Sequence, residues 1–164
     1  MGLDAAALFT EHHETLFLYL VRLTGDPELA ADATQEAFVR LIEKQPADLH
    51  PRAWLFRVAT NLARETARTR MRHRELEQAA GPRLMPEPTA TPDALAAARR
   101  DAERVRRALD SLDHRDRTVL LMREEGFAHR EIAAAANTTT GSIGTMIARA
   151  LARLAAALDE EATS

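Results

Sequence analysis

The chain has 164 residues, of which 46% are hydrophobic and only 4% aromatic, and it contains no cysteine. The lack of cysteine excludes disulfide frameworks, thiolate metal sites and cysteine nucleophiles. The formal net charge is −3, but residues 1–49 carry −6 and residues 50–74 carry +6. An acidic block followed by a basic block can bind a basic protein and a polyanion separately.

The sequence predicts no membrane span. The longest apolar run, residues 16–21, is far shorter than the roughly 20 residues needed to cross a bilayer. Asp4, Glu11 and Glu14 precede the first basic residue, Arg22, which is the wrong charge order for a secretory signal. We therefore expect a cytoplasmic protein.

A proline-rich segment divides the chain. Four of the seven prolines lie between Pro82 and Pro92, and proline favours extended backbone. We expect a linker over residues 76–92 that extends by roughly 3.1 Å per residue, about 50 Å in all. The fold class predicted is all-α, with small helical domains at residues 1–75 and 93–164.

Three helices are expected in the first domain. The first ends before Gly25, and the second spans residues 27–44 after an Asp26 cap. The third begins after His50-Pro51 and continues to about Arg74. The residues expected to face inward are Phe9, Leu16, Leu20 and Leu23 in the first helix, Leu29, Ala33, Ala37 and Leu41 in the second, and Trp54 or Leu55, Val58 and Leu62 in the third.

Four helices are expected in the second domain, over residues 93–109, about 113–122, 129–136 and 140–158. Asp113 and Asp116 resemble a capping pair, and Gly126 ends the short helix that they begin. The last two helices have the lengths and tight turn of a helix-turn-helix. The inward residues expected are Ala98, Val105, Ala108 and Leu112 in the first of these helices, and Ile143, Ile147, Leu151, Leu154 and Leu158 in the last.

Two surfaces of the first domain are candidate binding sites. The second helix places Asp32, Gln35, Glu36 and Arg40 at helical spacing beside Phe38, which indicates either a protein-docking patch or an ordinary solvated face. The third helix carries an arginine series with Trp54, Phe56 and Asn61, a combination suited to phosphates and unstacked bases. The alternatives are a solvated arginine face and a Trp54 that belongs to the core. The arginines of this series are Arg57, Arg64, Arg68 and Arg72.

The last helix offers few groups for reading bases. Thr139 or Thr140 can cap it, and Gly141 would allow close approach of a phosphate. Its exposed face has no lysine and few arginines, so bidentate base contacts are scarce. Any three-helix bundle also contains such helix pairs, so this pattern alone leaves DNA binding open.

No catalytic, metal or cofactor site is expected. The six histidines include no pair at a spacing that would place two ligands on one helix face. Serine occurs only at positions 111, 142 and 164, none of them in a nucleophile-elbow setting, and no phosphate-loop or dinucleotide motif is present. We expect a protein that is not an enzyme.

Several motifs resemble those of bacterial RNA polymerase sigma factors of the extracytoplasmic-function group. DATQEAFVRL at residues 32–41 and PRAWLFRVATNLA at 51–63 resemble the first conserved domain of that group. LDHRDRTVLLMREEGF at residues 112–127, followed by REIA at 130–133 and GSI at 141–143, is similar to its promoter-binding helix-turn-helix. The resemblance covers roughly residues 5–74 and 95–155.

The resemblance implies a promoter-specificity subunit that directs core RNA polymerase to start sites and melts promoter DNA. It implies that the linker lies near the RNA exit path and that an anti-sigma factor is a candidate partner. It assigns polymerase binding to Asp32, Gln35, Glu36, Phe38 and Arg40, the melted −10 element to Trp54, Arg57, Asn61, Arg64, Arg68 and Arg72, and the −35 element to Arg130, Thr140, Ser142, Gly144, Thr145 and Arg149.

This chain departs from the family pattern in its second domain. Ala128 stands where a capping serine is frequent, Asn137-Thr138 replaces the usual turn entry, and Gly144 and Met146 stand where a lysine and an arginine are frequent. Recognition of the −35 element would then depend more on backbone amides, Arg149 and DNA shape. The alternative functions are a stand-alone helix-turn-helix regulator, which leaves the first domain without a role, and a helical protein-binding adaptor.

Overall fold

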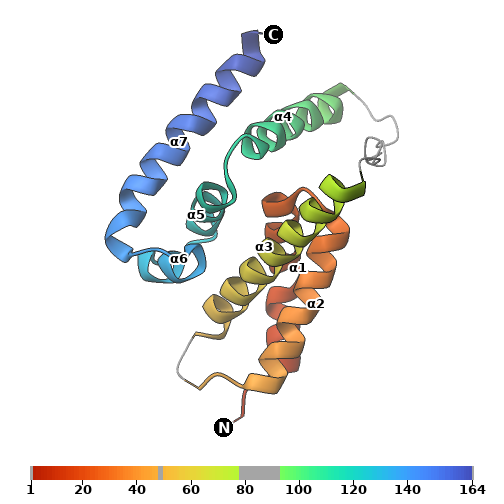
Figure 1. Cartoon of the computed structure of the whole chain (residues 1–164), viewed down its shortest axis with the longest axis vertical. Coiled ribbons are helices and arrows are strands. Elements are labelled where there is room, and N and C mark those ends of the chain that lie inside the picture. The colour runs from red at the N-terminus through yellow and green to blue at the C-terminus, as the bar shows by residue number, and fades with distance from the viewer. Residues whose placement is uncertain (1, 48–49, 78–92, 164) are drawn as a thin grey trace.

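The computed structural model describes residues 2–47, 50–77 and 93–163, and this part of the chain is all-α, as predicted. Figure 1 shows α5 and α6 between the α1–α3 bundle on one side and α4 and α7 on the other. The helices are α1 Ala5–Thr24, α2 Pro27–Lys44, α3 Pro51–Glu77, α4 Asp93–Asp110, α5 His114–Glu124, α6 His129–Ala136 and α7 Thr140–Thr163. The expected extended linker lies mostly outside the described residues.

Local capping sets the turn between α1 and α2. Gly25 has φ 67°, a left-handed conformation that ends α1 at little cost for a glycine. Asp26 Oδ1 accepts hydrogen bonds from the N–H groups of Glu28 and Leu29, at 3.1 and 3.2 Å. Its other carboxylate oxygen accepts from Arg70 Nη1 at 2.7 Å. One aspartate therefore caps α2 and ties α3 to the same corner.

The first three helices bury an aromatic and aliphatic core. Tyr19 and Phe56 are fully buried, with ring centroids 5.0 Å apart. The Tyr19 hydroxyl lies 2.8 Å from Thr60 Oγ1, and because Thr60 donates to the Phe56 carbonyl at 2.6 Å, Tyr19 is the donor to Thr60. Burial raises the pKa of Tyr19 far above its ordinary value, so it stays neutral and serves as a structural hydrogen-bond donor.

The helix-turn-helix of the second half is present where the sequence predicts it. Asp113 caps α5 by accepting the N–H of Asp116 at 2.8 Å, which confirms the capping pair. Ala128 has no side-chain oxygen to cap α6, and the Glu131 carboxylate accepts the Ala128 N–H at 2.8 Å instead. Asn137, at φ 54°, ends α6 in the left-handed conformation that asparagine tolerates.

Four of the predicted inward residues are wrong. Leu151 of α7 is 51% exposed, Val105 of α4 is 44% exposed and Phe9 of α1 is 47% exposed. Ala98 of α4 is also exposed. Arg153 still binds Asp116 of α5, but the C-terminal part of α7 lies along α4, where Glu161 accepts from Arg107 Nε at 2.9 Å (Figure 1). A single neighbouring helix cannot cover the full apolar stripe that the periodicity indicates.

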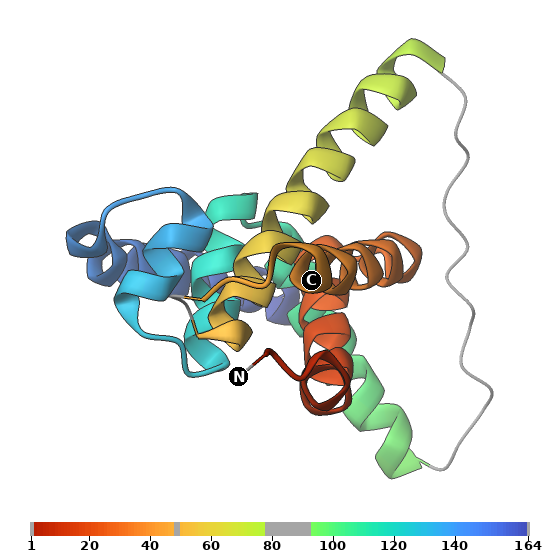
Figure 2. The ribbon, with the colours of Figure 1, turned by 90° about the horizontal axis from the view of Figure 1, so that it is seen from below.

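The two halves share one hydrophobic core, although the sequence predicted two small domains joined by a linker. α6 packs on α3 and α5 packs on α1, so the buried cluster runs without a break from Leu16 to Met146. Figure 2 shows α5 and α6 against the bundle, while the end of α3 and the start of α4 project away from it. Phe127, between α5 and α6, is 3% exposed and its ring lies 4.8 Å from that of Phe56.

One described helix, α7, is long and apolar enough to cross a membrane by length and composition alone. One face of this helix buries Ile143, Met146 and Ala150 within the protein, and Arg149 and Arg153 bind a buried carboxylate. This pattern is that of an amphipathic helix in a helical bundle.

Replacing Asp116 should destabilise the second half. This carboxylate is fully buried and accepts from Arg149 at 2.6 Å and from Arg153 at 2.9 Å. Asp116→Asn removes the charge that both guanidinium groups require, so we expect a loss of about 1–3 kcal/mol in the free energy of unfolding. Urea unfolding followed by circular dichroism measures it. Asp101→Asn, at a 76% exposed carboxylate, is the control and should change stability by less than about 0.5 kcal/mol.

His114 should make stability fall as the pH is lowered. Burial, with repulsion from Arg64 and Arg117, lowers the His114 pKa from 6.5 to about 4, although Asp113 opposes the shift. Between these values the unfolded chain binds a proton that the native chain does not, so stability falls as the pH drops, by up to about 1.4 kcal/mol per pH unit. Urea unfolding of the wild type and of His114→Gln at pH 7, 6 and 5 isolates this effect. Parallel curves for the two proteins would contradict the assignment.

Candidate nucleic-acid and polymerase interface

The acidic side of α2 is open to solvent. Asp32, Gln35 and Glu36 are exposed and Arg40 is partly exposed. Glu36 accepts from Arg40 Nε at 2.9 Å, a pair one helical turn apart that leaves the second Glu36 oxygen free to bind elsewhere. A basic protein surface would find three polar side chains here on one helix face.

Phe38 lies elsewhere than the docking hypothesis requires. It is only 5% exposed, and its ring packs 5.0 Å from Phe9 and 6.1 Å from His13. Phe38 therefore packs beneath the acidic side chains of α2 and is not itself exposed to a docking partner. The exposed apolar groups of α2 are Val39 and Ile42, at 42% and 56%, which the sequence analysis missed. Val39 and Ile42 follow Gln35 by four and seven residues, a spacing that places them on the same side of α2 as Gln35, and this was the available signal.

The arginines of α3 form a stripe on its outer side. Arg68 and Arg72 are exposed, while Arg57 and Arg64 are partly covered. Arg64 donates to Asn61 Oδ1 at 2.9 Å, so two of the predicted DNA contacts hold each other. Only the outer end of this stripe is fully open to a phosphate backbone in the structure described here.

The aromatic residues of α3 belong to the core. Trp54 is 6% exposed and Phe56 is fully buried, so in this arrangement neither offers a face on which a base could stack. Trp54 therefore belongs to the core, which is the alternative that the sequence analysis left open for it. The open face of α3 is cationic and not aromatic, which suits phosphates.

The helix-turn-helix presents most of its predicted DNA contacts. Arg130 of α6 and Thr140, Gly144, Thr145 and Arg149 of α7 are exposed, and Ser142 is partly covered. The hydroxyls of Thr139 and Ser142 lie 2.8 Å apart at the start of α7. The bond from Arg149 to Asp116 fixes the direction of its guanidinium and occupies one of its nitrogens. An arginine that is held in one direction is better suited to contact a phosphate than to form hydrogen bonds with base edges.

Gly144 and Met146 differ in what they could accommodate. A side chain added at Gly144 would meet nothing within 4 Å, so the missing lysine there is a true loss of surface charge. Met146 is 6% exposed and belongs to the core. An arginine at this position would have to be buried, so the departure at Met146 costs no DNA contact in this fold.

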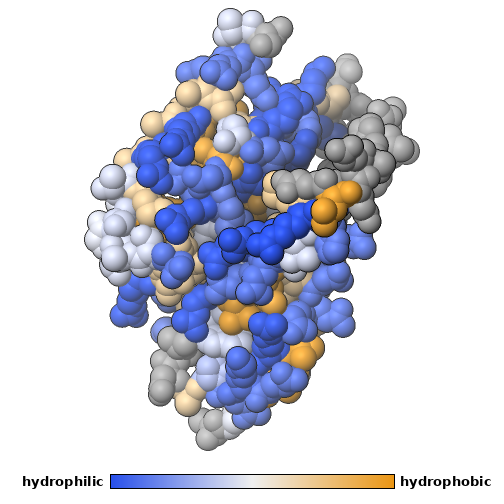
Figure 3. Space-filling view, in the orientation of Figure 1, coloured by the Kyte–Doolittle hydropathy of each residue, from blue (hydrophilic) through white to orange (hydrophobic). Residues whose placement is uncertain are grey.

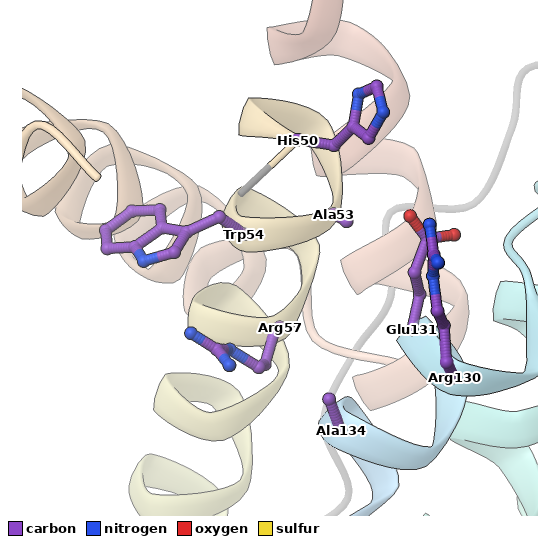
Figure 4. A pocket seen from close by; sticks show the side chains of 7 residues that line it. All are labelled: His50, Ala53, Trp54, Arg57, Arg130, Glu131 and Ala134. Atoms are coloured by element: carbon purple, nitrogen blue, oxygen red, sulfur yellow. The ribbon is translucent and has the colours of Figure 1, made fainter. Parts of the chain in front are cut away.

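The two predicted DNA-binding surfaces meet at a cavity of about 380 Å³ between α3 and α6. Figure 4 shows Trp54 and Arg57 extending from α3, and Arg130 and Glu131 projecting from α6 on the other side of the cavity. The lining residues are His50, Ala53, Trp54, Arg57, Arg130, Glu131 and Ala134. A predicted −35 contact thus lies beside two predicted −10 contacts.

Arg52 is a cation that the sequence analysis did not single out. Its guanidinium lies 4.2 Å from the centroid of Phe127 and 5.3 Å from that of Phe56. It also donates to the Glu125 carbonyl at 2.8 Å. The basic block of residues 50–74 was a signal for this arginine, but its partners come from the other half of the chain.

Comparisons with known proteins agree with both halves. The family model for sigma-70 region 2 matches residues 8–73, and that for sigma-70 region 4 matches residues 102–154. The ECF RNA polymerase sigma factor EcfG of Rhodopseudomonas palustris is 32% identical over 152 residues, covering 88% of this chain and 79% of that protein. SigE of Mycolicibacterium smegmatis is 28% identical over 147 residues, 87% of this chain but only 56% of the relative.

Solved sigma factor structures have the same fold. RpoE of Bartonella quintana, in complex with the anti-sigma factor NepR, matches with a TM-score of 0.70 and 21% identity over 95% of this chain and 97% of that one. CnrH, in complex with the cytosolic domain of CnrY, matches with a TM-score of 0.67 and 25% identity over 95% and 88% of the two chains. With regions 2 and 4 matched in order, this chain belongs to the ECF group of RNA polymerase sigma factors, non-catalytic initiation factors that bind core polymerase and promoter DNA.

Proposed function

We propose that this sigma factor divides its work between residues 1–75, which bind core polymerase and the melted −10 element, and residues 93–164, which bind the −35 element. The observation that carries this assignment is the separation of charge on one bundle. The open acidic side chains belong to α2, whereas the arginine stripe belongs to α3. A basic protein and a polyanion can therefore bind different faces of the first half at the same time.

The alternative functions leave part of this surface unused. A stand-alone helix-turn-helix regulator needs only α5–α7, and gives no role to the acidic side of α2 or to the region 2 match. A helical adaptor gives no role to the arginine stripe of α3. Because polymerase is the partner, we assign the chain to the cytoplasm and give it no chemical step of its own.

We further propose an anti-sigma factor as a partner. The two structural relatives described above were solved with NepR and with the cytosolic domain of CnrY. The apolar side chains that α7 and α4 leave exposed, Leu151 and Val105, are suitable contacts for such a protein. Figure 3 shows that the face in view is mostly hydrophilic, with its apolar side chains in separate small patches.

Reversing the charge of Asp32 should weaken polymerase binding. Asp32 is exposed on the acidic side of α2, so Asp32→Lys places a cation against a basic partner surface. We expect about a tenfold loss of affinity for bacterial core polymerase, about 1.4 kcal/mol, measured by fluorescence anisotropy, with a matching fall in run-off transcription at limiting sigma factor.

The control for this experiment is Glu14→Lys. Glu14 is an exposed carboxylate of α1 and is not one of the α2 residues assigned to polymerase binding, so the same change of net charge should leave core binding within twofold of the wild type. Equal losses from both substitutions would mean that only the total charge matters. A wild-type chain that neither binds core polymerase nor supports run-off from any promoter would refute the proposed function.

Neutralising Arg149 should weaken promoter binding without changing its preference. If this arginine contacts a phosphate, Arg149→Gln should lower the affinity of the holoenzyme for all −35 sequences by a similar factor. It should also reduce the slope of log affinity against log salt concentration by about 1. Binding of a set of single-base −35 variants at two salt concentrations measures both quantities. Thr145→Ala, on the same exposed side of α7, is the uncharged control and should keep the salt slope. A change of preference at a single base would contradict the phosphate role.

A further inference from the structure

A second cavity, of about 370 Å³, lies where α3, α5, α6 and α7 meet. Its size is within the range of roughly 300–1,000 Å³ that is usual for small-molecule sites. The polar side chains that line it come from three places: Arg64 from α3, Asp113, His114 and Arg115 from the start of α5, and Arg149 from α7. We call this space the basic cavity.

The carboxylates at the basic cavity are already engaged. Asp116, behind its wall, accepts from Arg149 at 2.6 Å and from Arg153 at 2.9 Å. Asp113 accepts the Asp116 N–H with one oxygen, at 2.8 Å, and its other oxygen lies 3.7 Å from Arg153 Nη1. These two carboxylates therefore balance the charges of Arg149 and Arg153, and leave no negative charge for the other cations.

Two arginines of the basic cavity have no carboxylate partner in the part of the chain that the structure describes. Arg64 donates from Nη2 to the neutral amide oxygen of Asn61 at 2.9 Å. Arg115 is exposed and forms no ion pair there. With the aspartates balanced by Arg149 and Arg153, the cavity has a surplus of two positive charges.

A buried nitrogen of His114 adds a polar group without a protein partner. Among the described residues, nothing forms a hydrogen bond with His114 Nε2, and this atom is out of contact with solvent. Burial, together with Arg64 and Arg117, lowers the pKa of His114 to about 4, against the opposite effect of Asp113. The ring is therefore neutral at pH 7, and it can donate one N–H. An anionic oxygen beside Nε2 would accept that N–H and offset the repulsion from Arg64.

We propose that the basic cavity binds the phosphate monoester group of a small phosphorylated molecule. Such a group carries a charge of about −1.5 to −2 at pH 7 and has three strong acceptor oxygens, which matches the surplus of two positive charges. The donors are Arg64, Arg115, the nitrogens of Arg149 that Asp116 leaves free, and His114 Nε2. Arginine forks are well suited to such oxygens.

A DNA backbone phosphate fits the basic cavity less well. It is a diester with one charge, and it is held within a polymer that cannot follow it into a cavity to reach His114 Nε2. The cavity is also larger than a phosphate group alone, so its remaining volume can accommodate the rest of a nucleotide-sized molecule.

A bound phosphate monoester would compete with promoter DNA. Arg64 and Arg149 are also among the residues proposed above for the −10 and −35 elements, so the ligand would occupy two cations that DNA uses. This consequence rests on the proposed function. The site itself goes beyond that function, and it is tested on the free chain, without polymerase.

The test is a titration of the full-length chain followed by NMR of the histidine rings and by calorimetry. The probes are inorganic phosphate, adenosine monophosphate and adenosine, at constant ionic strength. The two phosphates should shift the His114 ring signals saturably with one site per chain, and adenosine should not. The bound phosphate should also raise the pKa of His114, because a nearby anion favours the charged ring. The His114→Phe spectrum assigns these signals.

Two arginine variants on α5 give a matched comparison. Arg115→Gln removes a cation of the basic cavity and should weaken binding of adenosine monophosphate by about tenfold. Arg123→Gln makes the same change of net charge at an exposed arginine that does not line the cavity, and it should leave the affinity within about twofold. His114→Phe keeps a ring but removes Nε2, and it should also weaken binding. Circular dichroism checks that each variant is folded.

Several results would overturn the proposal. These are the absence of saturable binding by both phosphates, His114 signals that do not move when a phosphate binds, equal losses from Arg115→Gln and Arg123→Gln, and adenosine binding as tightly as its monophosphate. Duplex DNA that shifts the His114 signals when neither small phosphate does so would assign these cations to DNA instead. None of these results bears on run-off transcription, which tests the proposed function separately.

Discussion

The arrangement of this sigma factor depends on one carboxylate, Glu125, held between two arginines of the other half. Arg22 comes from α1 and Arg52 from the first turn of α3, so a single side chain of the second half fixes two helices of the first. Around it, Phe127 extends the aromatic core of the first half into the second. Without these groups, α5 and α6 would have no specific reason to lie against α1 and α3, and the small halves would each depend on a thin core of their own.

Part of the basic block of α3 also holds the two halves together. The block suits a phosphate backbone, but Arg52 at its inner end binds Glu125 and Phe127 of the second half. The outer end, at Arg68 and Arg72, is open. The acidic side of α2 is also open to solvent, so a basic protein can reach it in this arrangement of the two halves.

The helices were predictable from the sequence because local chemistry sets them. Asp26 and Asp113 cap α2 and α5, and Gly25 and Asn137 end α1 and α6 in left-handed conformations. The joint between the halves was not predictable, since it pairs residues about 70 to 100 positions apart and no local pattern links Arg52 to Phe127. Periodicity also misplaced Leu151 and Phe38, because an apolar stripe does not reveal which neighbour covers it. The predicted site residues therefore stand on the expected helices, while their mutual arrangement came only from the structure.

The most direct test of the shared core is the size of the free wild-type chain in solution, measured by small-angle X-ray scattering. A closed chain of 164 residues should have a radius of gyration close to the value of about 15 Å expected for a compact protein of this length. Two halves that move independently on an extended linker would give a much larger radius, on the order of 25 Å, with the scattering profile of a flexible pair. The first result is the one that the account predicts, and the second would contradict it.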